Sequence, residues 1–313
     1  MQVKNAAGGN PPRIGVSACL SGEAVRYDGG HKRQQWIVET LAREIELLPL
    51  CPEAAIGLGI PRPMIQLVAI NGEIRVRGVA EPERDVTSAL LAYADKIVRE
   101  VSEVDGWILK ARSPSCGLHD TPVYDTAGRQ IRSASGKFAE RLQQVFSVMP
   151  ITTETALAQA DLRDNFLERV FVYRAWRRLL RQGLTLSAMQ EFHYRLRGHL
   201  WARSNDIEQR VATQLEQKEA TREEGKEYIS LVMQALAIPA GRKGIGAALH
   251  RLLRESNPPV REANVIRESI DDYVAFRQKL ARPVALLSKQ VTAAPGAFLL
   301  CPEKAEQALR YQA

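Results

Sequence analysis

Residues 13–18 read RIGVSA and residues 106–111 read GWILKA, two short apolar runs that each lead into a polar loop with a cysteine. Such runs are typical of buried strands. Between them, two stretches have the apolar spacing of helices: QQWIVETLAREIELL (34–48) and VTSALLAYADKIVREVSEV (86–104). A third stretch, MIQLVAINGEIRVRGVA (64–80), has the pattern of two strands joined by an Asn-Gly turn. We therefore predict an α/β domain over residues 1–155, Rossmann-like with a mainly parallel sheet.

The pattern changes near residue 155, after which the apolar residues have the spacing of helices. A chain of 313 residues suits two domains, and we predict an all-α domain over residues 156–313. Within it, IPAGRKGIG (238–246) is expected to interrupt the helices as a turn or cap signal, and SIDDYVAFRQKLARPVALLSKQV (269–291) is expected to form a helix.

The positive charge is concentrated in the predicted helical domain. Residues 1–150 contain 18 Lys and Arg against 17 Asp and Glu, which leaves 25 against 19, a net charge of +6, for residues 151–313. A basic surface suits a polyanionic partner such as nucleic acid, although a solvated helical face is the commoner reason for such an excess. The chain has no apolar run of about 18 residues and its first residues do not resemble a signal peptide, so we expect a cytoplasmic protein.

Four cysteines are scattered along the chain, at Cys19, Cys51, Cys116 and Cys301, and none belongs to a CxxC motif. In the cytoplasm they are expected to be free thiols or metal ligands rather than disulfides. The first three each follow a strand-like run, the run before Cys51 being ELLPL (46–50). Because the carboxyl ends of parallel strands share one edge of a sheet, these three can converge there.

Three interpretations of the converging cysteines are open. Free thiols are often buried and inert. A zinc site completed by His31 or His119 is a second possibility, although a single histidine in a loop more often makes ordinary hydrogen bonds. Three thiolates without a fourth ligand would also suit an iron–sulfur cluster with one open iron.

Three loops favour the last interpretation through a resemblance. CLSGEAVRYDG (19–29), CPE with GLGIPRP (51–63) and KARSPSCG (110–117) resemble, in that order, the motifs of the TudS-type thiouracil desulfurases, which carry a 4Fe-4S cluster on three cysteines. This resemblance covers about residues 13–150. RDNFLERVFVYRAWRRLL (163–180) and EFHYRLRGHLWARS (191–204) resemble the helical domain of the RudS-type tRNA 4-thiouridine desulfidases. The later sequence departs from that pattern, and Arg203 stands where the family tends to have histidine.

The resemblance implies a function and a set of site residues. The expected reaction converts 4-thiouridine in tRNA to uridine with release of sulfide, by hydrolytic cleavage of the C–S bond without net redox change. Cys19, Cys51 and Cys116 would hold the cluster and leave the fourth iron open for the substrate sulfur, Glu53 would act as acid/base group, and Ser113 would handle a proton. Two alternatives are a desulfurase of free 4-thiouracil or thionucleotides, and a non-catalytic tRNA-binding or zinc-binding sensor module.

The remaining candidates concern substrate binding. In the cluster domain they are Arg26, Tyr27, Asp28, Arg62 and Ser115. In the helical domain Arg169, Arg195 and Arg197 are expected to contact RNA phosphates, with Tyr173, Tyr194 or Trp201 as stacking surfaces. Apart from the resemblance, a carboxylate at a helix start, a turn hydroxyl and an aromatic core residue are the ordinary roles of such side chains.

The tetrapeptide LCPE occurs twice, at 50–53 and at 300–303. Cys301 lies outside the three cluster motifs, and a fourth thiolate would block the iron that the substrate sulfur needs. We therefore expect Cys301 to have no part in the site.

Overall fold

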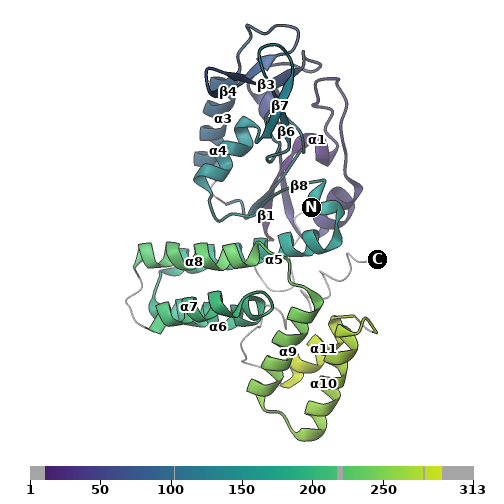
Figure 1. The fold of residues 1–313 in the computed structure, drawn as a ribbon, viewed down its shortest axis with the longest axis vertical. Coiled ribbons are helices and arrows are strands. Elements are labelled where there is room, and N and C mark those ends of the chain that lie inside the picture. Colours follow the sequence, from purple (N-terminus) through teal and green to yellow (C-terminus); the bar gives the residue numbers. More distant parts are fainter. Residues whose placement is uncertain (1–10, 102, 217–220, 278, 291–313) are drawn as a thin grey trace. The chain divides into compact units, whose positions relative to one another are not determined.

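The computed structural model describes residues 11–101, 103–216, 221–277 and 279–290 (Figure 1). The contacts divide the chain into two units, Met1–Gln159 and Ala160–Ala313. The first is an α/β unit and the second consists of helices, so the predicted fold classes are confirmed.

The first sheet of the α/β unit is entirely parallel. Its strands are β1 (Arg13–Ser17), β2 (Glu46–Leu50), β5 (Gly106–Leu109) and β8 (Ile151–Thr153), in the order β2-β1-β5-β8. All four residues of β5 are buried, as expected of a central parallel strand. The carboxyl ends of the four strands therefore lie at one edge, where β1, β2 and β5 lead to the three cysteines.

The second sheet is mixed. Its strands are β3 (Ile65–Ile70), β4 (Glu73–Gly78), β6 (Thr121–Tyr124) and β7 (Gln130–Ala134), in the order β4-β3-β6-β7. The predicted hairpin is confirmed: Asn71 and Gly72 have φ values of 51° and 85°, which suit the turns that match the strand twist. Strands β6, β7 and β8 were not predicted, because they are short and β7 is largely exposed.

Helical segments connect and cover these strands. The predicted helix over 86–104 is confirmed as α3 (Thr87–Glu100). The helix predicted over 34–48 was too long. In its place are a π-helical segment (Trp36–Thr40) and a 3-10 segment (Leu41–Arg43). Residues 46–48 belong to β2 instead. The other segments are α1 (Ala18–Ser21), α2 (Pro52–Ala55), α4 (Lys137–Val145) and a 3-10 turn (Ala156–Ala158).

The second unit contains α5 (Ala160–Gln182), α6 (Leu186–Trp201), α7 (Asn205–Glu216), α8 (Arg222–Leu236), α9 (Arg242–Ser256), α10 (Val260–Val274) and α11 (Ala281–Gln290). Trp176, Phe192 and Tyr228 form an aromatic centre, with ring centroids 5.4–6.1 Å apart. No helix among the described residues is long and apolar enough to span a membrane.

Two predictions in the helical unit were wrong in part. The 238–246 stretch does contain a cap at Gly241, but α9 begins at Arg242, and Gly244 lies within it. A Cβ on Gly244 would lie 2.2 Å from the Ala202 carbonyl oxygen, so this glycine permits close packing instead of breaking the helix. The 269–291 stretch is not one helix, because the chain turns after Val274 and Phe276 has a φ of 60°.

Gly15 provides a test of the parallel sheet. A Cβ at this position would lie 2.2 Å from the ring of Trp107, a fully buried side chain of β5. We expect Gly15→Ala to lower the free energy of unfolding by about 1–3 kcal/mol through overpacking. Thermal or urea unfolding would measure it. Gly241→Ala, whose methyl group meets nothing within 4 Å, is the control, and equal effects of the two substitutions would contradict the packing.

Candidate active site

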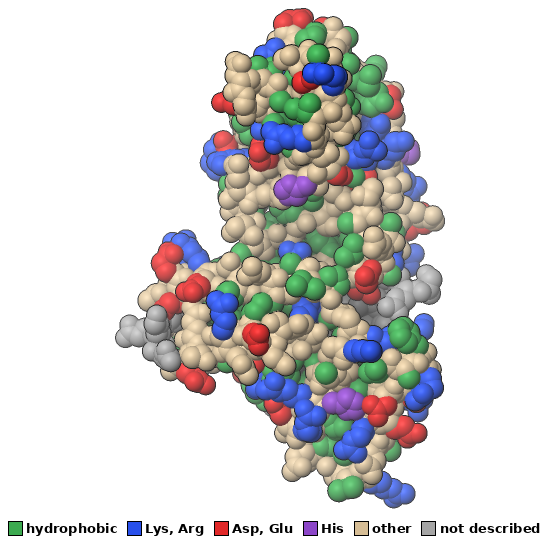
Figure 2. All heavy atoms as spheres, in the orientation of Figure 1, with side chains coloured by type: hydrophobic (Ala, Val, Ile, Leu, Met, Phe, Trp, Pro, Cys, Tyr) green, Lys and Arg blue, Asp and Glu red, His purple; other side chains and the backbone are tan. Residues whose placement is uncertain are grey.

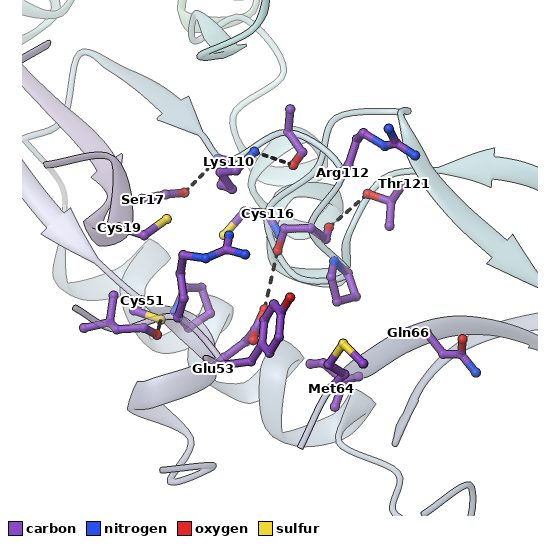
Figure 3. Close-up of a pocket in the computed structure, with 18 of the residues that line it drawn as sticks. Ser17, Cys19, Cys51, Glu53, Met64, Gln66, Lys110, Arg112, Cys116 and Thr121 are labelled. Atoms are coloured by element: carbon purple, nitrogen blue, oxygen red, sulfur yellow. Dashed lines mark hydrogen bonds between the residues drawn. The ribbon is translucent and has the colours of Figure 1, made fainter. Parts of the chain in front are cut away.

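Three cysteines from three strand ends line one pocket of about 700 Å³. Cys19 lies in α1 directly after β1, Cys51 caps the start of α2 after β2, and Cys116 lies in the loop after β5. Figure 3 shows their sulfur atoms on one side of the pocket and Met64 and Gln66 on the other. The predicted convergence is therefore observed, whereas Cys301 lies outside the described residues.

The three thiols influence one another electrostatically. Burial raises the pKa of Cys19 to about 11, with Cys51 adding to the shift and Arg26 and Lys110 opposing it. Burial also raises the pKa of Cys116 far above its usual range; a hydrogen bond with Ser17 opposes this shift. Cys51 has its pKa raised, again mainly by burial. Thiolates at these positions therefore need a cationic group to stabilise them.

Glu53 is held next to Cys51 by a buried ion pair. Its Oε2 accepts hydrogen bonds from Arg62 Nε at 3.1 Å and Nη2 at 2.9 Å. The Arg62 and Glu53 side chains are only 4% and 14% exposed, so this pair is shielded from solvent. Arg62 Nη1 also donates to the carbonyl oxygens of Val25 and Gly59, and its Nη2 lies 3.9 Å from Cys51 Sγ. Arg62 thus braces two site loops and orients the Glu53 carboxylate.

Two serines complete the surroundings of Glu53. The Oε1 atom accepts hydrogen bonds from Ser115 Oγ at 3.0 Å and from Ser113 Oγ at 3.4 Å. Ser113 Oγ also accepts the backbone N–H groups of Ser115 and Cys116, so its one proton is left to point towards Glu53. Ser113 therefore accepts backbone hydrogen bonds within the turn and also contacts the Glu53 carboxylate. Ser115, which is buried, lies closer to that carboxylate than Ser113 does.

Close packing fixes the loop that carries Cys116. A Cβ on Gly117 would lie 2.0 Å from Thr121 Oγ1, and one on Gly136 would lie 2.5 Å from the backbone of Ser115. Arg112, which precedes this turn, has a φ of 59°, and its N–H donates to both carboxylate oxygens of Asp120 at 3.1 Å. These contacts restrict the conformations that the loop can adopt.

Lys110, Ser17 and Glu154 belong to the site but were not predicted. Lys110 N donates to Ser17 Oγ at 2.9 Å, and the Lys110 ammonium forms an ion pair with Glu154. Lys110 and Ser17 line the pocket. The position of Lys110 directly after a strand-like run, inside the KARSPSCG motif, was a usable signal. No sequence signal indicated Glu154, because it follows β8 and that strand was not predicted.

The other predicted binding residues of this unit lie at the pocket or near it. Arg26 and Tyr27 line it, and the Arg26 guanidinium lies 5.2 Å from the Tyr27 ring centroid. Asp28 pairs with Arg26 at 3.5 Å and accepts the Gly30 N–H. Their roles in substrate binding stay predictions.

The predicted RNA-contacting arginines lie in the helical unit, where Figure 2 shows basic and acidic side chains interspersed on the visible face. Arg195 pairs with Glu191 at 2.6 Å, and Arg197 pairs with the buried Glu208 at 3.1 Å. Arg169 is half-buried, and burial lowers its pKa. Trp201 is buried and its ring is covered by the guanidinium groups of Arg197 and Arg251, which leaves Tyr173 and Tyr194 as the more open rings. RNA binding stays a prediction.

The donor set of three soft thiol side chains fits an iron–sulfur cluster. Among the described residues, no group of three or more His, Cys, Asp or Glu side chains is spaced for one metal ion. Three thiolates that bind three different irons stand farther apart than ligands of a single ion, and soft thiolates are the ligands that such clusters prefer. His31 and His119 do not line the pocket, and both ring nitrogens of His119 contact Ser135 and Gln143.

Two comparisons with known proteins found similarities to the N-terminal unit. The family model of 2-thiouracil desulfurase matches residues 14–154. The N-terminal unit of the chain belongs to this family. A solved structure, described as the [4Fe-4S]-dependent thiouracil desulfidase TudS, has 30% sequence identity, and the match covers 47% of this chain and 93% of that chain with a TM-score of 0.38. No curated protein matches the chain.

In this desulfurase domain, the Arg62–Glu53 pair can be tested through stability. Arg62→Met leaves a shielded carboxylate without its cation, and we expect the free energy of unfolding to fall by about 3 kcal/mol or more. Arg62→Met combined with Glu53→Gln should lose less than the sum of the single changes.

The matched control is Arg129→Met. Arg129 also pairs with a carboxylate, Asp125 at 2.9 Å, but its side chain is 81% exposed. Urea unfolding should show a loss below about 1 kcal/mol for this variant. Equal losses for Arg62→Met and Arg129→Met would contradict the assigned role of the buried pair.

Proposed function

We propose that the chain is a [4Fe-4S]-dependent desulfidase that converts 4-thiouridine in tRNA to uridine and releases sulfide. The observation that carries the proposal is the convergence of three cysteine thiols and one oriented carboxylate, Glu53, on a single pocket. Membership of the N-terminal unit in the 2-thiouracil desulfurase family supports the same class of reaction.

Cys19, Cys51 and Cys116 would hold the cluster. When bound, the cluster supplies a Lewis-acidic iron that polarises the C–S bond of the thiobase. Arg26 and Lys110, which already oppose the raised pKa of Cys19, would offset the negative charge of the thiolates.

Glu53 would act as the general base, and its contacts support one way for water to reach it. A carboxylate offers about four lone-pair sites. Two are taken by Arg62 at Oε2 and two by the serines at Oε1. The Ser113 contact, at 3.4 Å, is the longest of the four. A water molecule therefore gains access to Glu53 most easily by displacing the Ser113 hydroxyl, which can then hydrogen-bond to that water.

The reaction balances without an external electron donor or acceptor. Glu53 takes one proton from water, and the water oxygen forms a bond to C4 of the base. The second water proton passes from the new C4 hydroxyl group, through the Ser113 hydroxyl, to the sulfur as the C–S bond breaks with its electron pair on sulfur. The products are the uracil base and hydrosulfide. Arg62 keeps the carboxylate aimed at the water throughout.

The proposal that the substrate is a tRNA is based on the second domain. The net charge of +6 over residues 151–313 suits an RNA backbone, and the family resemblance of residues 163–204 points to the same substrate. Free 4-thiouracil or a thionucleotide is the alternative, because the pocket itself needs to hold only the base.

We expect different substitutions to affect turnover and iron content separately. Glu53→Gln should lower turnover at least about 100-fold while iron content stays normal, because it removes the base but no cluster ligand. Cys51→Ser should abolish both, and Cys301→Ser should affect neither. The measurements are loss of thiobase absorbance, sulfide release and iron content of anaerobically reconstituted protein. Full turnover by Glu53→Gln would exclude the proposed mechanism.

The substrate is tested by parallel assays with 4-thiouridine-containing tRNA and free 4-thiouracil. We expect kcat/KM to be higher for tRNA and to fall as salt rises, because phosphate contacts are screened. Equal or better use of free 4-thiouracil, without salt dependence, would favour the small-molecule alternative. Colourless protein that binds zinc would favour the sensor module instead, since iron–sulfur proteins are brown.

A further inference from the structure

Lys110 is the first residue after β5, the strand that leads to Cys116, and it lines the same pocket as the three cysteines. Figure 3 shows it on the cysteine side, close to Ser17 and Cys116. The ammonium group therefore lies where a sulfur atom held near the cysteines would be within its field.

The Lys110 ammonium group is held in place by two acceptors, which leaves one of its three N–H donors. One N–H is directed to Glu154, which is itself only 7% exposed, and another donates to the Ala111 carbonyl oxygen at 3.0 Å. Glu154 is held in turn by the Ala111 N–H at 2.7 Å. A lysine ammonium has three donors, and the third has no acceptor among the described residues. Since the Lys110 side chain is still 21% exposed and lines the pocket, this donor is open to a ligand there.

The buried Arg62 guanidinium near the cysteines is differently placed. Its donors are directed to Glu53, to the Val25 and Gly59 carbonyl oxygens and to the Cys51 sulfur, so it has no donor to spare. Lys110 thus combines a rigid position with an open donor on the cysteine side of the pocket.

We propose that Lys110 is a further catalytic residue, which donates a hydrogen bond to the departing sulfur, and that Glu154 is the positioning residue that holds it there. The proposal rests on the proposed desulfidase function. The C–S bond breaks with its electron pair on sulfur, and Lys110 stabilises the resulting hydrosulfide while keeping its own proton. One water proton remains on Glu53 and the second passes from the C4 hydroxyl group to the sulfur, so the step needs no other reactant.

Charge on sulfur is larger in the transition state than in the bound thiobase, so loss of Lys110 should act on kcat rather than KM. We expect Lys110→Met to lower kcat about 100-fold, the typical effect of removing one donor to a developing anion, with KM changed less than about threefold. Affinity for added sulfide, titrated by absorbance changes without thiobase present, should fall about tenfold. Lys110→Arg, which keeps the charge, should recover most of the sulfide affinity.

Lys137→Met is the matched control. Lys137 lies in the same domain, is 12% exposed and pairs with Glu140 at 2.7 Å, but it does not line the pocket. This variant should keep normal kcat and sulfide affinity.

Three outcomes decide the proposal. Normal kcat and sulfide affinity in Lys110→Met with normal iron content would overturn it. Failure of both Lys110→Met and Lys110→Gln to take up iron would assign Lys110 to assembly of the site and would also overturn it. A kcat loss with unchanged sulfide affinity would assign it a role other than the departing sulfur. Absence of desulfidation by the unaltered protein would instead reject the proposed function, and the sulfide titration would still report on Lys110.

Discussion

Parallel pairing of β1 with β2 and β5 is the constraint on which the site depends. Three strands that run the same way end at one edge, and each is followed there by a cysteine from a different part of the chain. The pairing needs Gly15, because Trp107 of the neighbouring strand fills the space where another residue would place a side chain. A packing requirement inside the sheet thus determines whether the cysteines can act together.

A second layer of contacts organises the polar groups above that edge. Two buried or half-buried charges near the thiols have an opposite partner: Arg62 pairs with Glu53 of the same segment after β2, and Lys110 after β5 pairs with Glu154 after β8. Such pairs are costly to break but give orientation, because both partners are held by further hydrogen bonds. One pair presents a carboxylate to the pocket and the other an ammonium group. The carboxylate and the ammonium group, to which we assign addition of water and departure of sulfur, therefore each have another partner and do not pair with one another.

Much of this arrangement could be predicted from local patterns. The apolar run before each cysteine, the Asn-Gly turn and the spacing of α3 each depend on a few neighbouring residues. What could not be predicted depends on distant partners. The helical pattern of residues 34–48 overlaps the strand-like run 46–50, so the start of β2 is determined only by its pairing with β1, and β8 is too short to recognise without β5 beside it. The role of Ser115 at Glu53, and that of Glu154 at Lys110, likewise require the three-dimensional neighbours.

The central claim is that Cys19, Cys51 and Cys116 hold one cluster while Cys301 does not. Native mass spectrometry of the anaerobically reconstituted chain, combined with thiol alkylation, tests it most directly. The account predicts the added mass of one [4Fe-4S] cluster, protection of the first three cysteines and alkylation of Cys301. A zinc adduct, or protection of Cys301 together with loss of protection at one of the other three cysteines, would contradict it.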